Sequence, residues 1–122
     1  MKLSAYIVLV DSGFSPNPFW GRCTLACCKP TVRRKAATGD IVVGSGSARA
    51  NLSGRLVYAM RVSEVLPYDE YWQRFPSKRP SNRSEITRRG DNIWHLVDGR
   101  WEGVGGALHD RRHRARDLRG EN

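Results

Sequence analysis

The sequence predicts one small α+β domain, residues 1–104, followed by an arginine-rich tail, residues 105–122, that we expect to be exposed or disordered. Its apolar segments are short and rich in Ile, Val and Tyr, which is typical of strands. No long amphipathic helix is present to form a parallel βαβ crossover. Asp98-Gly99, between two short apolar segments, is a strong hairpin signal. These observations predict a small, mostly antiparallel, barrel-type sheet with short helices.

The first elements are strands on either side of a proline-rich loop. Leu3–Val10 predicts a strand that is buried on both faces. In the loop that follows, Thr24–Cys28 predicts a helical turn that Pro30 would end. Ile41–Val43 predicts a second buried strand, which leads into the segment Gly44–Ser47.

The later elements alternate between regular and irregular structure. Arg55–Leu66 predicts the longest strand, and because most of both faces is apolar we expect it to be central. Tyr68–Gln73 predicts a short helix whose acidic first turn suits the helix dipole. Phe75–Arg89 has no periodicity and predicts a long basic loop, a feature that is uncommon in a small domain unless it is functional or disordered. Ile93–Val97 predicts the first strand of the hairpin.

The charge of the chain favours a polyanionic partner. Lys and Arg number 21 against 12 Asp and Glu, which gives a net charge of +9. The excess is concentrated in residues 29–35 and 74–89 rather than spread evenly, as nucleic-acid-binding proteins require. The alternative is a solvated basic surface in a protein with high arginine usage.

The composition also indicates a cellular setting. No apolar segment is long enough to span a membrane, and no signal peptide is visible. Three cysteines, two of them adjacent, make a poor disulfide framework. We therefore expect a cytoplasmic protein that does not enter the membrane.

Residues 14–30 contain three aromatic residues, three prolines and all three cysteines. A loop of this composition is costly to leave in water, so we expect it to fold over something and to form the wall of a binding pocket. Aromatic rings beside basic residues suit nucleotide recognition, because bases stack on rings while cations hold phosphates.

The predicted ligand contacts fall into groups by chemistry. Stacking surfaces are expected from Trp20, Tyr58 and Trp72, with Phe19 beside them in the loop. Phosphate contacts are expected from Lys29, Lys78 and Arg79. Contacts to a base edge are expected from Asn17, Ser45, Ser47, Asp91 and Asn92.

An enzyme is the alternative that the residues leave open. Cys23 would be a nucleophile of depressed pKa, with Asp91 and His95 as acid–base groups. The sequence has no nucleophile elbow, phosphate-binding loop, dinucleotide fingerprint or metalloprotease motif. The catalytic residues are therefore unassigned beyond these three candidates, and no cofactor is predicted.

A zinc site is the second alternative. Cys23 and Cys27 are four residues apart, as are His109 and His113, and Cys28 adjoins the first pair. Structural zinc sites usually draw their ligand pairs from neighbouring elements, whereas 81 residues separate Cys28 from His109. We expect buried cysteines that fill apolar space, and no metal.

Several segments in the same order resemble the nucleotide modification associated domain 2 family. The resemblance covers about residues 4–97 and rests on Phe14–Gly21, Cys23–Ala26, Cys28-Lys29-Pro30, Gly39-Asp40, Gly44–Ser47, Leu56–Met60, Tyr71-Trp72 and Gly90–Ile93. It implies a setting in DNA base modification systems of phages or mobile elements, without a defined reaction. The chain departs from this family after Trp101, where an Arg-rich tail takes the place of further sheet-forming sequence.

A second resemblance concerns the fold. The order of Gly39-Asp40, a buried strand and then Leu56–Met60 is similar to the small barrels of the PUA, EVE and YTH group. This resemblance implies a barrel that holds a modified or flipped base in an aromatic-walled pocket.

The sequence thus predicts a nucleic-acid or nucleotide binding module, associated with DNA base modification and recognising a modified base. The alternative is an enzyme that acts on nucleotides or bases through Cys23, Asp91 and His95. A third hypothesis is an interaction protein whose basic face meets an acidic protein partner. The sequence makes no prediction about the oligomeric state.

Overall fold

The computed structural model describes residues 1–119, and its first half is a three-stranded sheet. The strands are β1 (Leu3–Val8), β2 (Ile41–Gly46) and β3 (Leu56–Arg61), in the order β1-β2-β3. β2 and β3 are antiparallel, with an irregularity at Gly44 and Ser45. The central strand is β2, so the prediction that the segment of β3 is central was wrong.

β1 and β2 are parallel, with Leu3 opposite Ile41 and Val8 opposite Gly46. The sequence argued against such a pair because no long helix could make the crossover. Residues 9–40 make it instead with an extended loop and one short helix, α1 (Pro30–Lys35). The helical turn predicted at Thr24–Cys28 is absent, because the backbone of Thr24 pairs with that of Asn17 and the helix begins at Pro30. Proline suits this first helical position, because a backbone N–H at this position would have no hydrogen-bond partner within the helix and proline has none to lose.

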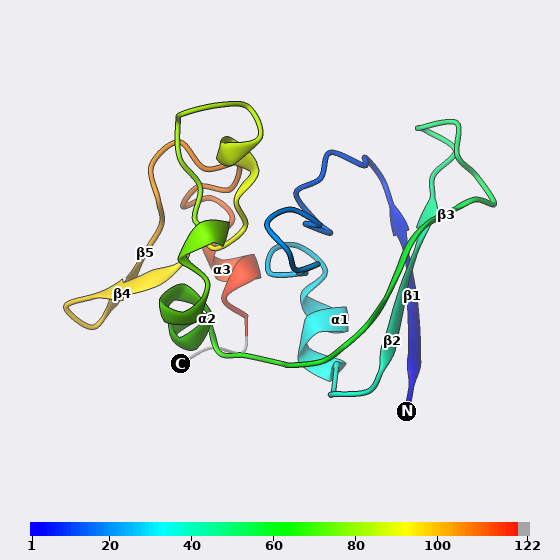
Figure 1. Ribbon diagram of the computed structural model, residues 1–122, viewed down its shortest axis with the longest axis horizontal. Helices are drawn as coiled ribbons and strands as arrows, with labels where there is room; N and C mark the ends of the chain where they lie inside the picture. Colours follow the sequence, from blue (N-terminus) through cyan, green and yellow to red (C-terminus); the bar gives the residue numbers. More distant parts are fainter. Residues whose placement is uncertain (120–122) are drawn as a thin grey trace.

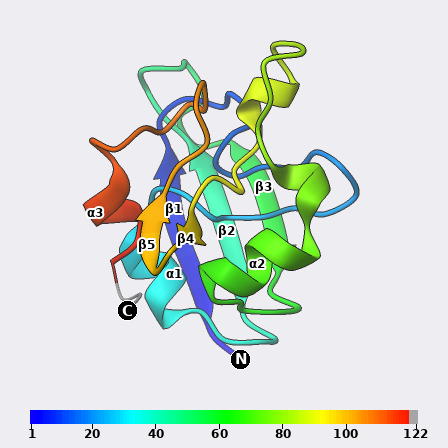
Figure 2. The ribbon, with the colours of Figure 1, turned by 90° about the vertical axis from the view of Figure 1, so that its left-hand side faces the viewer.

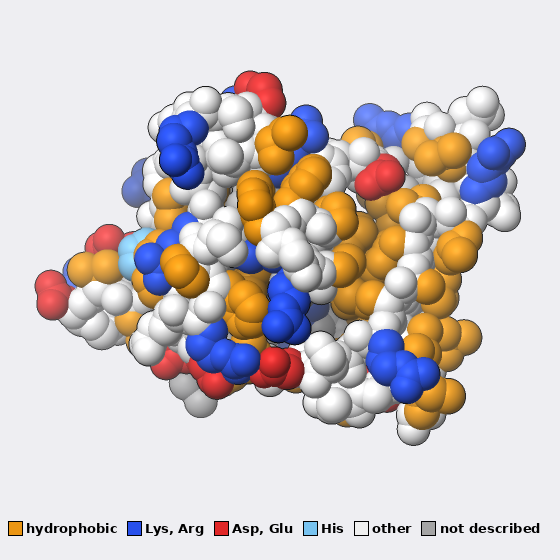
Figure 3. All heavy atoms as spheres, viewed as in Figure 1, with side chains coloured by type: hydrophobic (Ala, Val, Ile, Leu, Met, Phe, Trp, Pro, Cys, Tyr) orange, Lys and Arg blue, Asp and Glu red, His pale blue; other side chains and the backbone are white. Residues whose placement is uncertain are grey.

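The sheet buries one face only. Val8 and Val42 are buried on the inner side, whereas Leu3, Ile7 and Leu9 on the outer side are each more than half exposed. Hydrophobic side chains therefore line the outer edge of the molecule on the right of Figure 3. The prediction that the first strand is buried on both faces was wrong, because no described element covers this outer face.

The second half lies on the inner side of the sheet. It contains α2 (Tyr68–Arg74), the hairpin of β4 (His95–Val97) and β5 (Arg100–Glu102), and α3 (Arg114–Asp117). Figure 1 shows α2 and this hairpin to the left of the three-stranded sheet, and Figure 2 shows them in front of it, with residues 62–67 joining the two parts. The predicted helix after Pro67 and the predicted hairpin are both confirmed.

Asp98 and Gly99 turn the hairpin with φ values of 50° and 78°. Two consecutive residues of positive φ match the right-handed twist of the strands that they join. The residues before β4 differ from the prediction, since Ile93 and Trp94 are fully buried core residues rather than strand residues.

The main hydrophobic core unites segments from both halves of the chain. It contains Phe14, Ala26, Cys27, Tyr68, Tyr71, Ile93, Trp94 and Leu118. Within residues 1–119 the two sheets stay separate and neither closes into a barrel, so the domain is α+β with a mixed sheet and a hairpin. No helix of the described chain has both the length and the apolar character needed to span a bilayer.

The C-terminal segment is attached to this core. Most side chains of residues 105–119 are exposed, but His109, Asp117 and Leu118 are buried. The last three residues of the predicted tail, 120–122, lie outside the described residues. α3 thus fixes the end of the described chain against the loop that contains Cys27.

Candidate functional site

A cleft of about 640 Å³ lies between the inner face of the sheet and α2. This volume is within the usual range for small-molecule sites. Residues 22–26 and α1 form one side, and the connection of residues 61–67 forms another. Figure 3 shows hydrophobic side chains in the gap between the two halves of the molecule, with Lys and Arg side chains around them.

The cleft is strongly basic. Its charged lining residues are Arg22, Arg33, Arg34, Arg61, Arg119 and a single acidic residue, Glu64. Glu64 is already paired with Arg74, whose Nη1 lies 2.8 Å from its Oε2. This hydrogen bond holds the pKa of Glu64 below its usual range, so the carboxylate stays ionised and paired. Several arginine charges of the cleft are therefore left for an anionic ligand.

Arg33 lines the cleft and is bound to three other segments of the chain. Its Nε donates a hydrogen bond to the carbonyl of Cys28 at 2.7 Å, and its Nη1 donates to the hydroxyl of Tyr68 at 2.7 Å and to the carbonyl of Asp117 at 3.0 Å. Its Nη2 is buried and has no hydrogen-bond partner among the described residues. An unpartnered guanidinium nitrogen is costly to bury, which favours an acceptor supplied from outside the chain.

The apolar part of the cleft includes one accessible aromatic ring. Tyr68 and Tyr71 are 6% exposed and belong to the core, whereas Phe75 is half-buried. The guanidinium groups of Arg22 and Arg74 lie 6.0 Å and 5.4 Å from the centre of the Phe75 ring. A ring beside cations can stack a base while the cations meet a phosphate.

The three rings predicted to form the pocket do not line this cleft. Tyr58 lies on the sheet, where its hydroxyl is 2.7 Å from that of Tyr6. Trp72 is stacked between the His95 ring at 3.9 Å and the guanidinium of Arg79, also at 3.9 Å. Trp20 packs on Phe19. Trp20, Tyr58 and Trp72 thus lie outside this cleft, whose accessible ring is Phe75, the residue after α2.

Four other predicted contacts serve the fold instead. Lys78 is 0% exposed, and its Nζ donates to the backbone carbonyl and the side-chain Oδ1 of Asn17, both at 2.9 Å, and to the carbonyl of Arg22. An ammonium group saturated by three internal acceptors has no donor left for a phosphate. Lys78 was expected to contact a phosphate. In the structure it connects the loop of residues 14–30 to the predicted basic loop instead.

Asp91 and Asn92 are also 0% exposed. Asp91 accepts hydrogen bonds from the hydroxyls of Thr24 and Tyr71, both at 2.6 Å. Burial raises its pKa, although these bonds act to lower it. The amide nitrogen of Asn92 donates to the carbonyls of Tyr71 and Phe75 at 3.0 Å. Asn17, Asp91 and Asn92 therefore form the polar core of the domain rather than an accessible base-reading edge.

The remaining predicted residues lie around the sheet. The hydroxyl of Ser47 donates to the carbonyl of Leu9, and that of Ser45 lies 3.4 Å from the carbonyl of Tyr6. The ammonium of Lys29 is 5.1 Å from the centre of the Tyr6 ring. These contacts tie β1 to its neighbours and lie outside the cleft.

The predicted enzyme candidates are not brought together. Cys23 lines the cleft, and the residue as a whole is exposed. Partial burial nevertheless raises the pKa of its thiol, whereas the enzyme hypothesis required a lowered one. His95 stacks on Trp72, with its Nδ1 3.2 Å from the carbonyl of Ile93. Asp91 is sealed in the polar core. Among the described residues the three form no common site.

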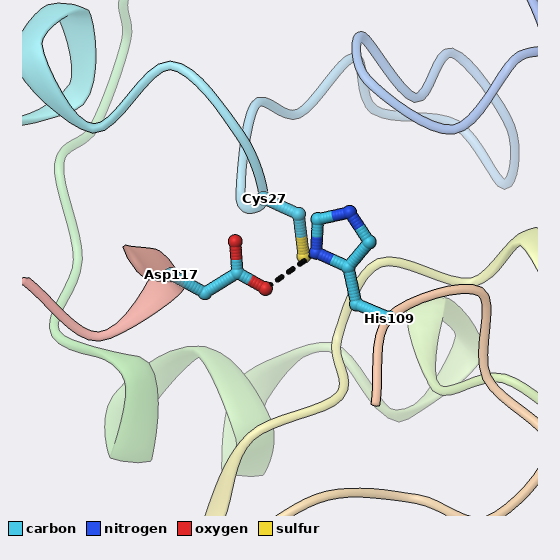
Figure 4. Close-up of side chains that lie close together, drawn as sticks. All are labelled: Cys27, His109 and Asp117. Atoms are coloured by element: carbon cyan, nitrogen blue, oxygen red, sulfur yellow. Dashed lines mark hydrogen bonds and ion pairs between the residues drawn. The ribbon is translucent and has the colours of Figure 1, made fainter. Parts of the chain in front are cut away.

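A different cysteine and a different histidine do meet. Cys28 Sγ lies 3.5 Å from His109 Nε2, and His109 Nδ1 lies 2.6 Å from Asp117 Oδ2. Cys27 is close by, and its sulfur lies within 4.8 Å of ligand atoms of His109 and Asp117 (Figure 4). The fold thus brings Cys28 and His109, two residues that the zinc alternative considered, together across their 81-residue separation.

Comparison with known proteins identifies the chain. The sequence model of the family described as nucleotide modification associated domain 2 matches residues 1–120. The chain belongs to this family. No curated protein and no solved structure matches it. The description of the family indicates an association with nucleotide modification, and the match includes the Arg-rich segment after Trp101 that was expected to depart from it.

Charge and burial make the His109–Asp117 pair sensitive to pH. Burial acts to lower the pKa of His109, but its hydrogen bonds with Asp117 and Cys28 outweigh this and raise it to about 9. Burial acts to raise the pKa of Asp117, but hydrogen bonds from His109 and Trp94 bring it below 3.8. At neutral pH the pair is therefore a buried ion pair.

This pair predicts a pH-dependent stability. The contribution of His109 is complete below its unfolded pKa of 6.5 and is lost as the pH rises through about 9. That of Asp117 is present above 3.8 and is lost as the pH falls below that value. Urea unfolding at about pH 6 and pH 9 should show that the wild type exceeds His109→Gln in stability by a few kcal/mol at the lower pH and by less at the higher one. An equal difference at both pH values would contradict the pairing.

Proposed function

We propose that this protein binds a phosphate-bearing nucleotide, free or within a short single strand, in the basic cleft, as part of nucleotide modification. The observation that carries the proposal is the cleft itself, in which five arginines and one already paired glutamate surround an apolar floor with an accessible Phe75 ring. The ring would stack on the base while Arg33, Arg34 and Arg61 hold the phosphates.

The chemistry of the cleft favours this class of ligand over an acidic protein. Arg22, Arg34 and Arg61 form no ion pair with any residue of 1–119, so their charges are available. The cleft is concave and of nucleotide-sized volume, whereas acidic proteins usually meet an extended basic face. Planar guanidinium groups also match the paired oxygens of a phosphate.

A binding titration with a fluorescent single-stranded oligonucleotide tests the proposal. Because counterions are released from each neutralised phosphate, the logarithm of affinity should fall linearly with the logarithm of salt concentration, with a slope of about −2 to −3 for three or four phosphate contacts. Poly-glutamate of similar length and charge is the control. Equal affinity for both polyanions would contradict base stacking, and an affinity that ignores salt would contradict phosphate binding.

The modified base is a separate part of the proposal, supported by the family to which the chain belongs. The same titration with an oligonucleotide that carries one hydroxymethylated pyrimidine, compared with the unmodified strand, measures this preference. Tighter binding of the modified strand supports it, and equal binding contradicts it without affecting the proposal of the nucleotide cleft.

A further inference from the structure

The His109 ring connects a thiol and a carboxylate through its two different nitrogens. Nε2 faces Cys28 Sγ at 3.5 Å, and Nδ1 faces Asp117 Oδ2 at 2.6 Å. This is the order of nucleophile, base and orienting acid that activates a weak nucleophile in acyl-transfer enzymes. The three residues come from the loop before α1, from the segment after β5 and from α3.

The orienting carboxylate is held rigidly. Asp117 is 0% exposed, and its Oδ2 also accepts a hydrogen bond from Trp94 Nε1 at 3.0 Å. Its Oδ1 accepts one from the backbone N–H of Cys28 at 3.2 Å. The same carboxylate thus fixes both the ring of the base and the backbone of the thiol residue, which is the geometry that preorganisation requires.

The base is held equally well. The His109 ring packs against Phe14, with ring centres 4.9 Å apart, and stacks on His113 at 4.0 Å with an interplanar angle of 10°. With Phe14 and His113 packed against the ring and Nδ1 bonded to Asp117, the ring cannot turn without breaking these contacts. Nε2 therefore stays directed at Cys28.

The backbone at Cys28 is unusual. Cys28 has a φ of 61° and Lys29 a φ of 45°, so two consecutive non-glycine residues adopt the left-handed conformation. Each is an uncommon conformation that costs free energy, and such residues cluster at functional sites. Here the turn presents the half-buried Cys28 thiol to His109, while the preceding Cys27 is fully buried.

We propose that Cys28 is the nucleophile of an acyl-transfer site, with His109 as its acid–base group and Asp117 as the positioning residue. This inference is independent of the nucleotide cleft and adds an activity to it. The substrate class is a carboxylic ester or amide. The charge of Arg116, which acts on the thiol, favours an acyl group or leaving group that carries negative charge.

The reaction balances with these groups alone. The Cys28 thiolate attacks the carbonyl carbon and forms a C–S bond, the bond to the leaving group breaks, and the leaving oxygen or nitrogen takes the proton from His109 Nε2. A water molecule then gives a proton to Nε2 and attacks the thioester. The C–S bond breaks, the carboxylic acid leaves, and the thiolate–imidazolium pair is restored. An amine in place of water would receive the acyl group.

The same residues could instead form a metal site with Cys27. Two contacts favour the nucleophile. Cys27 Sγ lies 3.5 Å from the backbone carbonyl of Asp91, to which a protonated thiol donates, and burial raises the pKa of this thiol well above its usual range. Both nitrogens of His109 already have partners. Metal binding is nevertheless an outcome that the test below includes.

Alkylation of the three cysteines provides the first test. The wild-type chain is treated with iodoacetamide at several pH values, and the rate at each cysteine is followed by peptide mass spectrometry. Hydrogen bonding to His109 overcomes the effect of burial and lowers the pKa of Cys28, whereas that of Cys23 is raised. At about pH 6 we expect Cys28 to react several-fold faster than the more exposed Cys23, because the thiolate is the reactive form.

Variants show whether Cys28 reacts fast because His109 activates it or only because its thiol is accessible. His109→Gln should slow alkylation of Cys28 at about pH 6 and shift its pH profile upward, without changing the rate at Cys23. His95→Gln is the matched control, since His95 contacts Trp72 and the carbonyl of Ile93 and none of Cys28, His109 and Asp117. Far-ultraviolet circular dichroism shows which variants fold, and the wild-type comparison of Cys28 with Cys23 needs no variant at all.

Acyl capture provides the second test, with p-nitrophenyl acetate as the probe. We expect a burst of p-nitrophenolate and an acetyl adduct on Cys28 that is absent from Cys28→Ser. Acetylation of Cys23 instead, or alkylation of Cys28 no faster than that of Cys23, would overturn the proposal. So would one tightly bound zinc ion per chain that protects Cys28 from alkylation.

Discussion

Reversing the charge of Arg34 and Arg61 together should weaken oligonucleotide binding by about tenfold or more for each residue, or ~1.4 kcal/mol each. Both side chains line the cleft, are exposed, and form no ion pair among residues 1–119. The Arg34→Glu, Arg61→Glu variant replaces two attractions for phosphate by two repulsions. Its fold should be unaffected, because neither side chain is buried.

The matched control changes the net charge equally at a different place. Arg83 and Arg100 are exposed, unpaired among the described residues and outside the cleft. Arg83→Glu, Arg100→Glu should reduce affinity only slightly, through the long-range field, and should leave the salt dependence of binding nearly unchanged. Fluorescence anisotropy at two salt concentrations measures both variants. Equal losses in the two variants would mean that net charge, and not the cleft, governs binding.

Lys78→Met should destabilise the protein by several kcal/mol. The substitution removes the donor for Asn17 Oδ1 and for the carbonyl of Arg22, whereas the carbonyl of Asn17 keeps a hydrogen bond from the backbone N–H of Thr24. Each acceptor left unpaired costs about 1–3 kcal/mol. The total is a large part of the free energy of unfolding of a domain of this size, which is about 5–15 kcal/mol. We expect the variant to be largely unfolded or to unfold at much lower urea concentration.

The control for this variant is Lys35→Met. Lys35 is an exposed residue at the end of α1, and the substitution changes the charge in the same way. Its urea midpoint should match that of the wild type. A Lys78→Met protein as stable as Lys35→Met would show that the buried ammonium is not what connects the loop of residues 14–30 to the rest of the core.

The parts of the fold that follow from local rules were predictable. Pro67 followed by an acidic first turn predicts α2, and the Asp98-Gly99 pair predicts the hairpin, because each depends on a few neighbouring residues. The parallel pairing of β1 and β2 was not predictable in this way. It depends on a crossover whose extended loop is held by tertiary contacts, among them those of Lys78.

In the site too, features set by neighbouring residues were predictable and features set by distant contacts were not. The sequence identified residues 29–35 as a basic segment, and Arg33 and Arg34 of that segment do line the cleft. It could not show that Lys78 is buried, because a lysine in a polar, irregular segment is usually exposed and its partner Asn17 is 61 residues away. For aromatic residues, the sequence could not show which side of α2 faces the cleft, so Trp72 was chosen instead of Phe75.

The meeting of Cys28 with His109 was missed for a related reason. The residue types were noted, but the separation along the chain argued against a common site. The signal that could have found it is Asp117, eight residues after His109 in the arginine-rich tail. A carboxylate in an arginine-rich segment can pair with a buried cationic side chain, as Asp117 does with His109.

The central claim is that the arginine-lined cleft receives a nucleotide. Chemical-shift mapping of the ¹⁵N-labelled protein during titration with thymidine 5′-monophosphate tests it most directly, since both backbone amides and arginine Nε groups report on the contact. We predict that the largest shifts occur at residues 22–26, at Arg33, Arg34 and Arg61, and at Phe75. Shifts confined to the β4–β5 hairpin and to the stack of Arg79, Trp72 and His95 would contradict the account.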